Sequence, residues 1–317
     1  MTGYIVRRVF LIVPTLLLLG TLLFFMLQFI PGDVASTLLA SEENAATPEA
    51  IEKLRKQLGL ADPLHEQYFR WLGKMVRGDL GYSAYFNQSV WDAIKPKIDV
   101  TVTLALLGVF VAIVISIPVG VLSALFRGSA FDQAVRAVSA IGMAVPAFWL
   151  GIMILLVLSR GVGWAPPAQH ADILDDPIKA LQRFMFPALI LGFRSAAVIS
   201  RMIRSMMLEV LNEDYVRTAW SKGLLPRVVI VKHALRNALL PVVTMLGMLF
   251  ASLLDGAVVL ETVFNLPGIG LHLIESVRGR DAAMVLGMVL MIGVFMMIWI
   301  LLIDLSYKVL DPRRSSA

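Results

Sequence analysis

Long apolar runs without charged side chains dominate the hydrophobic pattern of this chain. A helix rises about 1.5 Å per residue, so crossing about 30 Å of hydrocarbon takes about 20 residues. Five runs free of Asp, Glu, Lys and Arg approach or exceed that length, and a sixth is broken by Arg194 and ends near Arg201. The pattern therefore predicts six transmembrane helices, at residues 9–32, 100–126, 137–159, 184–203, 237–254 and 282–303.

The composition agrees with a membrane protein. Hydrophobic residues make up 58% of the chain and charged residues 16%, whereas soluble domains carry about 25% charged residues. The net charge of +5 is what cytoplasmic loops rich in Lys and Arg produce, so the lipid bilayer is expected as a partner and nucleic acid is not. The first apolar run exceeds the 7–15 residues of a secretory signal core, which favours an uncleaved first span. We predict an all-α integral membrane protein.

The distribution of Lys and Arg predicts the orientation in the membrane. If the N-terminus lies inside, the inner segments hold 14 Lys and Arg residues, against 5 in the short outer loops. The long segment 33–99 holds 8 more, but long loops cross largely regardless of charge. Both termini and the loop 205–236, called the basic loop below, are therefore expected in the cytoplasm.

Three regions follow from this topology. Residues 1–32 form the cytoplasmic N-terminus and the first span, and residues 33–99 form an external helical segment. Residues 100–317 form a five-span core that includes the basic loop, residues 205–236.

The external segment carries the signals of two short helices. Thr47 is a good N-cap, Pro48 suits the first helical position, and Gly59 suits the end. Asp62 is expected to cap the second helix, which Gly78 ends. One face of this helix is apolar at helical spacing, and it consists of Leu64, Tyr68, Trp71, Leu72 and Met75. It serves either as a lid packed on the spans or as a docking surface for an external partner.

Several kinds of catalytic chemistry have no motif in this chain. There are no cysteines, so disulfides and thiolate sites are excluded. No G-x-x-x-x-G-K-[ST] phosphate loop or G-x-S-x-G elbow occurs, and the four His residues form no HExxH pair. We predict a protein that is not an enzyme, with no catalytic or metal site and no cofactor of its own.

Few ionisable residues lie inside the predicted spans. Arg194 is about ten residues into the fourth span, while Asp255 and Asp304 lie near span ends and are expected as interfacial anchors or caps. A central charge costs about 2.5–3.5 kcal/mol on insertion scales, so Arg194 is expected to face the bundle interior. There it either binds an anionic group on a translocation path or pairs structurally. The lack of central carboxylates leaves a transporter energised from elsewhere, or a passive pore.

The basic loop contains a predicted amphipathic helix. Its apolar positions recur at near-helical spacing, at Leu208, Leu211, Tyr215, Ala219 and Trp220. Glu213 and Arg217 form an i,i+4 pair in the favoured order. Gly223 is expected to stop the helix in a left-handed conformation, and Pro226 starts a second segment that runs into the fifth span. Ala219 and Gly223 give the helix a small-residue patch, which permits close approach to a groove on a partner; an interfacial helix resting on lipid is equally open.

The residues of this loop resemble a known family. "EDYVRTAWSKGL" (213–224), with Ala219, Gly223 four residues later and the ending "RNALLP" (236–241), is similar to the EAA-type loop of binding-protein-dependent ABC importer permeases. It most resembles the dipeptide, oligopeptide and nickel permeases. The departure is Trp220-Ser221, where small or basic residues are common. Supporting motifs are "RRVFLIVPTLLLL", "FIPGD", "LGLADPLHEQYFRWL", "GDLGYS", "PAFWLG" and "ETVFNLPGIG".

This resemblance implies the permease subunit of an ATP-driven importer in a bacterial inner membrane. A second homologous permease would complete the path, two cytoplasmic ATPase subunits would bind ATP and magnesium, and an external binding protein would deliver the substrate. Family substrates are short peptides, glutathione-like compounds, nickel chelates and some sugars. The residues implied to couple to the ATPases are Leu211, Glu213, Asp214, Tyr215, Arg217, Thr218, Ala219, Lys222, Gly223 and Leu224.

Two other functions compete with this prediction. A passive channel or secondary carrier would move a solute without ATPases. A membrane-embedded enzyme would need paired carboxylates or a His cluster at matched depth, and the sequence offers neither. The segment "ETVFNLPGIG" (261–270) is expected either as part of an outer gate or as a simple connector.

Overall fold

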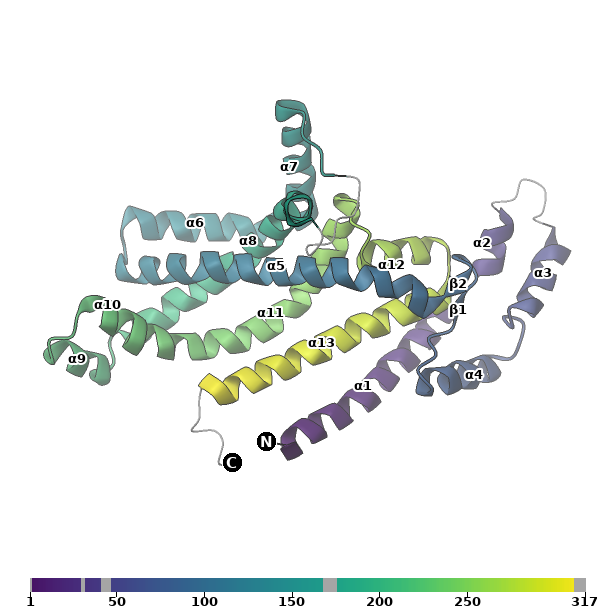
Figure 1. Cartoon of the computed structure of the whole chain (residues 1–317), viewed down its shortest axis with the longest axis horizontal. Helices are drawn as coiled ribbons and strands as arrows, with labels where there is room; N and C mark the ends of the chain where they lie inside the picture. The colour runs from purple at the N-terminus through teal and green to yellow at the C-terminus, as the bar shows by residue number, and fades with distance from the viewer. Residues whose placement is uncertain (1, 30–31, 41–46, 168–175, 311–317) are drawn as a thin grey trace. The chain divides into compact units, whose positions relative to one another are not determined.

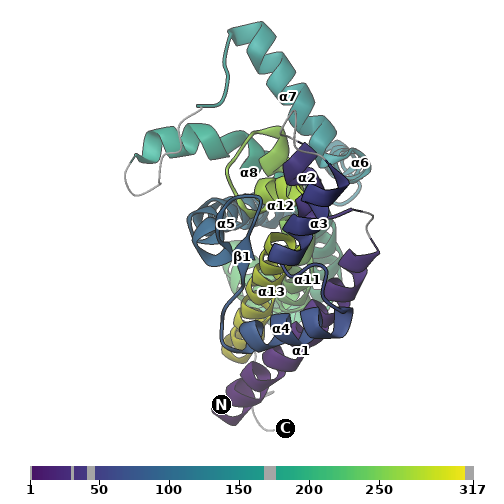
Figure 2. The ribbon, with the colours of Figure 1, turned by 90° about the vertical axis from the view of Figure 1, so that its right-hand side faces the viewer.

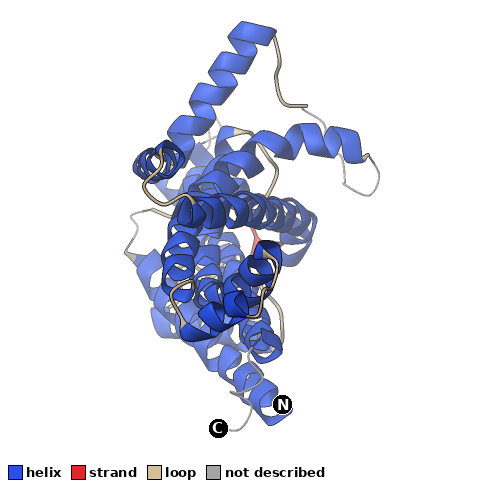
Figure 3. Cartoon of the chain, turned by 90° about the vertical axis from the view of Figure 1, so that its left-hand side faces the viewer, coloured by secondary structure: helices blue, strands red, loops and turns tan. Residues whose placement is uncertain are grey.

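The computed structural model of the chain describes residues 2–29, 32–40, 47–167 and 176–310, and regular structure in these ranges is almost entirely helical (Figures 1 and 3). The helices are α1 (Thr2–Gln28), α2 (Val34–Ala40), α3 (Pro48–Gln57), α4 (Leu64–Val76), α5 (Val90–Leu125), α6 (Ala130–Ala144), α7 (Ala147–Val162), α8 (Pro177–Val210), α9 (Asp214–Ser221), α10 (Pro226–Val228), the π-helix η1 (Val229–Leu235), α11 (Arg236–Val263), α12 (Ile269–Arg278) and α13 (Ala282–Leu310). The predicted all-α class is confirmed.

A small antiparallel hairpin is the feature that the helical pattern did not predict. Strands β1 (Tyr82–Ser83) and β2 (Gln88–Ser89) pair with Tyr82 opposite Ser89. Asn87, just before β2, has a φ of 53°, a left-handed conformation that Asn tolerates better than most residues.

Within the described ranges, five helical segments are long and apolar enough to cross a membrane. They are Phe10–Gln28, Val90–Leu125, Pro177–Val210, Pro226–Met245 and Ala282–Asp304. The pair α6 and α7 makes a sixth if it counts as one span, but the two helices are bent by 100°. The third span expected at 137–159 is therefore divided between two helices in this structure. Val145 before Pro146 is extended (ψ 127°), because a residue preceding proline is disfavoured in the helical region.

The chain divides into two compact units, and α5 and α13 contribute residues to both. Unit 1 comprises Met1–Val100 and Pro267–Met297, and unit 2 comprises Thr101–Leu266 and Ile298–Ala317.

Unit 1 packs α4 onto the first span. The α4 helix lies across α1 (Figure 2), where the Tyr68 ring is 5.5 Å from that of Phe24 and the Trp71 ring stacks on Phe24 at 5.6 Å. The hydroxyls of Thr21 and Tyr68 are 3.1 Å apart. The apolar face predicted for this helix is thus occupied by α1 at Tyr68 and Trp71.

The ends of α3 and α4 test the capping predictions. Thr47 caps α3 by accepting a hydrogen bond from the Ala50 amide at 3.3 Å, as predicted. The predicted Asp62 cap of α4 is wrong, because Pro63 occupies the N-cap position and the Asp62 carboxylate pairs with Arg70 instead. Gly59 and Gly78 follow α3 and α4 with positive φ values of 69° and 78°, which confirms both predicted ends.

Unit 2 is built around α8, which packs against α6, α7 and α11. Glycines bring α5 against the same helix. A Cβ added at Gly120 of α5 would lie 2.7 Å from the Ser200 carbonyl oxygen, and one at Gly192 of α8 would lie 2.5 Å from the Val111 side chain. Such close approach through small residues is how helices associate in lipid, where there is no hydrophobic drive between helices.

One buried carboxylate of unit 2 was not anticipated from the sequence. Glu261 near the end of α11 is fully buried and accepts a hydrogen bond from the Thr101 hydroxyl of α5 at 2.6 Å. The predicted fifth span stopped at residue 254, whereas α11 continues to Val263, so Glu261 was placed in a loop.

Candidate functional site

The basic loop forms a short helix between α8 and η1. The sequence predicted one helix through Leu208 and Leu211 to Gly223, but α8 ends at Val210 and α9 begins only at Asp214. Glu213 occupies the N-cap position with an extended ψ of 146°. The Asn212 side chain donates a hydrogen bond to the Leu208 carbonyl at 2.7 Å, which is the kind of local bond that competes with continuing a helix.

The end of α9 follows the prediction. Gly223 has a φ of 75° and donates its amide hydrogen to the Trp220 carbonyl at 2.9 Å. A Cβ at this position would meet nothing within 4 Å. Within this chain, glycine is needed here for the left-handed backbone and not for close approach of a neighbouring element.

The inner face of α9 rests on the chain's own apolar surface. Val216 and Ala219 are buried against Val229 of η1, and Val210 and Leu211 pack against the same cluster. We call this cluster the α9 seat. Ala219 therefore lies on the face of α9 that a neighbouring segment of the same loop covers, and its part in coupling stays a prediction.

A hydrogen bond and a π-helix lie next to the α9 seat. The Asn237 amide of α11 donates to the Tyr215 hydroxyl at 2.9 Å. The seven residues of η1 are π-helical, a rare conformation with wider turns that is often associated with functional sites. Val229 and Ala234 of η1 are both fully buried, so the π-helix directs side chains both toward α9 and toward the core of unit 2.

The C-terminal end of α9 and the turn after it expose apolar side chains. Trp220 is 43% exposed, Leu224 36% and Leu225 71%. Arg217 and Lys222 are exposed beside them. The predicted pair of Arg217 with Glu213 is wrong, since Arg217 lies 3.3 Å from the Asp214 carboxylate instead. An exposed apolar patch with basic side chains indicates an interaction surface.

The structure sorts the predicted site residues by exposure. Of the ten candidate coupling residues, Ala219 is buried, Leu211 is half-buried and the remaining eight are exposed. Arg194 is exposed on α8 and is therefore not enclosed by this chain's own helices. Its assignment to a translocation path stays a prediction.

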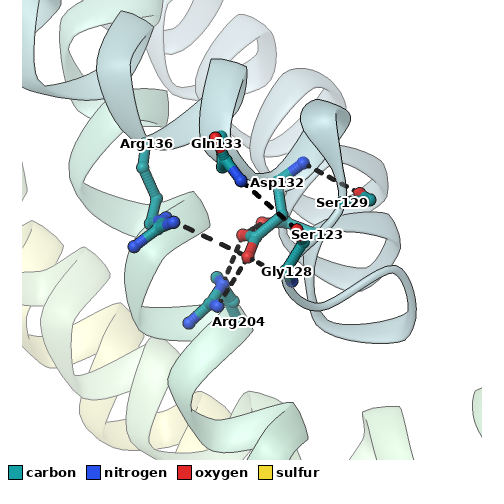
Figure 4. A network of polar contacts seen from close by, with 7 residues as sticks. All are labelled: Ser123, Gly128, Ser129, Asp132, Gln133, Arg136 and Arg204. Carbon is teal, nitrogen blue, oxygen red and sulfur yellow. Dashed lines mark hydrogen bonds and ion pairs between the residues drawn. The ribbon is translucent and has the colours of Figure 1, made fainter.

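A buried ion pair lies close to the basic loop in unit 2, and sequence reasoning missed it (Figure 4). Asp132 of α6 is fully buried. Arg204 of α8 donates Nε to one Asp132 oxygen at 2.6 Å and a second guanidinium nitrogen to the other oxygen at 2.8 Å. The Ser123 hydroxyl donates at 2.6 Å and the Gly128 amide at 3.0 Å. We call Asp132, Arg204, Ser123 and Gly128 the polar clamp.

The sequence did carry a signal for half of the polar clamp. Ser129 caps α6 by accepting from the Asp132 amide at 3.2 Å, while the Asp132 carboxylate reaches back to Gly128. Ser129 and Asp132 match the S-x-x-D form of a capping box. Nothing local links Asp132 to Arg204, which lies 72 residues later.

The two arginines near Asp132, Arg204 and Arg136, differ in exposure and in how closely they approach the carboxylate. The Arg204 side chain is 20% exposed and makes two short, roughly parallel bonds, which is the strong bidentate geometry. Arg136 is 54% exposed and comes only to 3.9 Å. Among the described residues, no group of three or more His, Asp or Glu side chains is placed to hold a metal ion.

Comparison with known proteins identifies the family. Residues 116–316 match the family described as binding-protein-dependent transport system inner membrane component, and residues 1–105 match the N-terminal part of such membrane components. The chain belongs to this family. It is a multi-pass permease subunit of an ATP-driven ABC importer, and it works with other components of such a system.

Individual relatives span the whole permease. A Brucella suis protein named as a peptide transport system permease is 39% identical, with 99% of each chain covered. The dipeptide transport system permease protein DppB of Escherichia coli K12 is 37% identical, covering 99% of this chain and 98% of that protein. A crystal structure of an amino acid ABC transporter has the same fold over 68% of the permease and 94% of its own chain, with a TM-score of 0.51 and 16% identity.

Proposed function

We propose that this permease imports short peptides across a bacterial inner membrane, using ATP that separate subunits hydrolyse. Relatives covering almost the full chain are named as peptide or dipeptide permeases, which supports this substrate class. In this arrangement a second, homologous permease completes the translocation path, and an external binding protein delivers the peptide. Both termini and the basic loop face the cytoplasm, where Lys and Arg are concentrated.

The single observation that carries the coupling proposal is the way α9 is held. One face is fixed by the α9 seat, while Trp220 at its C-terminal end and Leu224 and Leu225 just after it remain exposed, next in the chain to basic side chains. A short helix held from one side, with exposed apolar side chains at its end, suits docking into a groove on each of two cytoplasmic ATPase subunits. Those subunits bind ATP and magnesium, so the permease itself needs no nucleotide site.

The mechanism follows from rigid-body movement. ATP binding draws the two ATPase subunits together, and each carries one docked α9 with it. The spans connected to α9 follow, so the path opens outward to receive the peptide from the binding protein. Hydrolysis separates the ATPase subunits and returns the path to the inward-open state. In this cycle Tyr215, Arg217 and Gly223 transmit force and do no chemistry.

A matched pair of substitutions at Gly223 tests the docking surface. Gly223→Asn keeps a residue that tolerates positive φ, whereas Gly223→Arg adds a long charged side chain at the end of the exposed face. Both variants should insert in the membrane at normal yield. Gly223→Arg should lose co-purification of the ATPases and peptide-stimulated ATP hydrolysis, and Gly223→Asn should retain both.

Transport itself is tested in proteoliposomes that contain the permease, its partner permease and the ATPases, with binding protein and labelled dipeptide outside. Uptake should require ATP inside together with the binding protein. Movement of the dipeptide through the permease alone, without ATPases, would instead establish a passive channel or secondary carrier. Normal ATPase binding by Gly223→Arg would show that α9 is not the docking element.

A further inference from the structure

The polar clamp joins three segments of unit 2 through one side chain. The Asp132 carboxylate accepts hydrogen bonds from Ser123 in α5, from Gly128 in the turn before α6, and twice from Arg204 in α8. Figure 4 shows these donors converging on the carboxylate. A fully buried carboxylate in apolar surroundings would be costly alone, so this arrangement is stable only while all three segments keep their relative positions.

A continuous path of packed side chains connects the polar clamp to α9. Ile203 and Met207, on either side of Arg204 in α8, are fully buried in a core cluster. Val210 and Leu211 pack against that cluster and also against the α9 seat. The end of α8 that bears Arg204 is therefore connected to α9 through packed side chains.

The apolar faces of α6 and α7 toward α8 are only partly filled. An open groove of about 220 Å³ is lined by Phe131 and Val135 of α6 and by Phe193 of α8. A larger open groove of about 630 Å³ has Ile154 of α7 and Phe186 of α8 among its lining residues. Apolar packing is non-directional, so it does not by itself fix how α6 is placed along α8.

We propose that the Asp132–Arg204 pair is the positioning contact that makes α6 and α7 move together with α9 during transport. This inference rests on the proposed function of α9. The bidentate geometry fixes both the spacing and the rotation of α6 relative to α8. Because α7 leaves α6 at a bend of 100°, movement of α6 along its axis becomes a sideways movement of α7 in the membrane.

The decisive experiment separates this role from simple stabilisation. The double variant Asp132→Asn/Arg204→Met removes both charges together and leaves no buried charge unpaired. The Asn oxygen can accept from the Gly128 amide, and the Ser123 hydroxyl can accept from the new NH2 group. Arg204→Lys keeps the charge but cannot form the two parallel bonds. Arg136→Gln is the matched control, because Arg136 approaches the same carboxylate only loosely.

The measured quantity is the number of labelled dipeptides imported per ATP hydrolysed by the full complex in proteoliposomes. We expect this ratio to fall about tenfold in the double variant and in Arg204→Lys, while ATPase co-purification and hydrolysis persist. Arg136→Gln should stay within about twofold of the wild type. If the pair only stabilises the fold, the double variant will assemble with a wild-type ratio, and that result overturns the inference. If the double variant fails to assemble, the ratio in Arg204→Lys decides instead: a wild-type ratio in that variant also overturns the inference.

A distance measurement tests the inference independently of transport. The chain has no cysteines, so spin labels can be attached at Ala140→Cys on α6 and Glu209→Cys on α8, which are both exposed. The label-to-label distance should have one narrow distribution with the polar clamp intact and a broad one in the double variant. An unchanged distribution in the double variant would refute the positioning role. A wild-type complex that imports no dipeptide with ATP would instead refute the proposed function.

Discussion

The α9 seat and the polar clamp hold neighbouring parts of unit 2 by opposite means. The seat is apolar, with Val216 and Ala219 against Val229, and Tyr215 with Asn237 adds one hydrogen bond at its edge. Apolar burial is non-directional and scales with area, at about 25 cal/mol per Å². The clamp buries an ion pair whose bonds define direction as well as distance.

The difference shows what each region can tolerate. A small apolar seat can adjust as α9 tilts, because no single contact depends on an angle. A buried carboxylate cannot lose its arginine without becoming an uncompensated charge, so the contact between α6 and α8 is either intact or broken. The permease thus places an adaptable contact beneath its exposed helix and a rigid one behind it.

The largest effect should come from breaking one side of the polar clamp. Arg204→Met leaves Asp132 buried without its cation, and we expect a loss of about 3–5 kcal/mol of stability. Thermal unfolding in detergent measures this loss, and the double variant Asp132→Asn/Arg204→Met should recover most of it. A single variant as stable as the wild type would mean that Asp132 has another adequate partner.

A smaller, local effect is expected at the α9 seat. Val216→Ala removes two buried carbon atoms, which should cost roughly 1–3 kcal/mol. The loss should appear as faster hydrogen exchange in α9 while the polar clamp and the global melting temperature are little changed. Val231→Ala is the control, because Val231 of the same η1 segment is 60% exposed. If α9 exchanged hydrogen equally fast in Val216→Ala and Val231→Ala, the buried seat would stabilise α9 no more than an exposed position does.

The end of α9 should respond to backbone conformation alone. Gly223→Ala places a Cβ on a residue with φ 75°, at a cost of about 1 kcal/mol. Gly223→Asn should cost less. Hydrogen exchange of the last amides of α9 distinguishes the two, and identical rates would show that the turn relaxes to a negative φ.

The smallest effect is expected for the exposed ion pair on α9. Arg217 and Asp214 are 68% and 95% exposed in their side chains, and such pairs add little to stability because water and salt screen them. Arg217→Gln should therefore leave the melting temperature unchanged at low and high salt. A clear salt-dependent loss would mean that exposed charge, and not the apolar seat, holds α9.

The sequence predicted where α9 stops and where the next segment starts better than it predicted where α9 begins and what it contacts. The glycine stop at Gly223 and the start of a new segment at Pro226 both hold, because these residues act on the backbone locally. The extent of α9 and the Arg217 partner were wrong, and Ala219 is buried within the chain. Helical spacing of apolar residues did not reveal that the chain turns at 211–213 and folds back so that η1 covers Ala219.

By itself the sequence determined the class of molecule, the positions of most membrane helices and the resemblance to a permease family, since apolar length and local motifs are properties of contiguous residues. Only the tertiary structure decided that the third span breaks at Pro146, that Glu261 is buried beside Thr101, and that Asp132 meets Arg204. Side-chain pairs so far apart in the chain have no local periodicity. They are decided by how the helices pack and by the cost of leaving a buried charge without a partner.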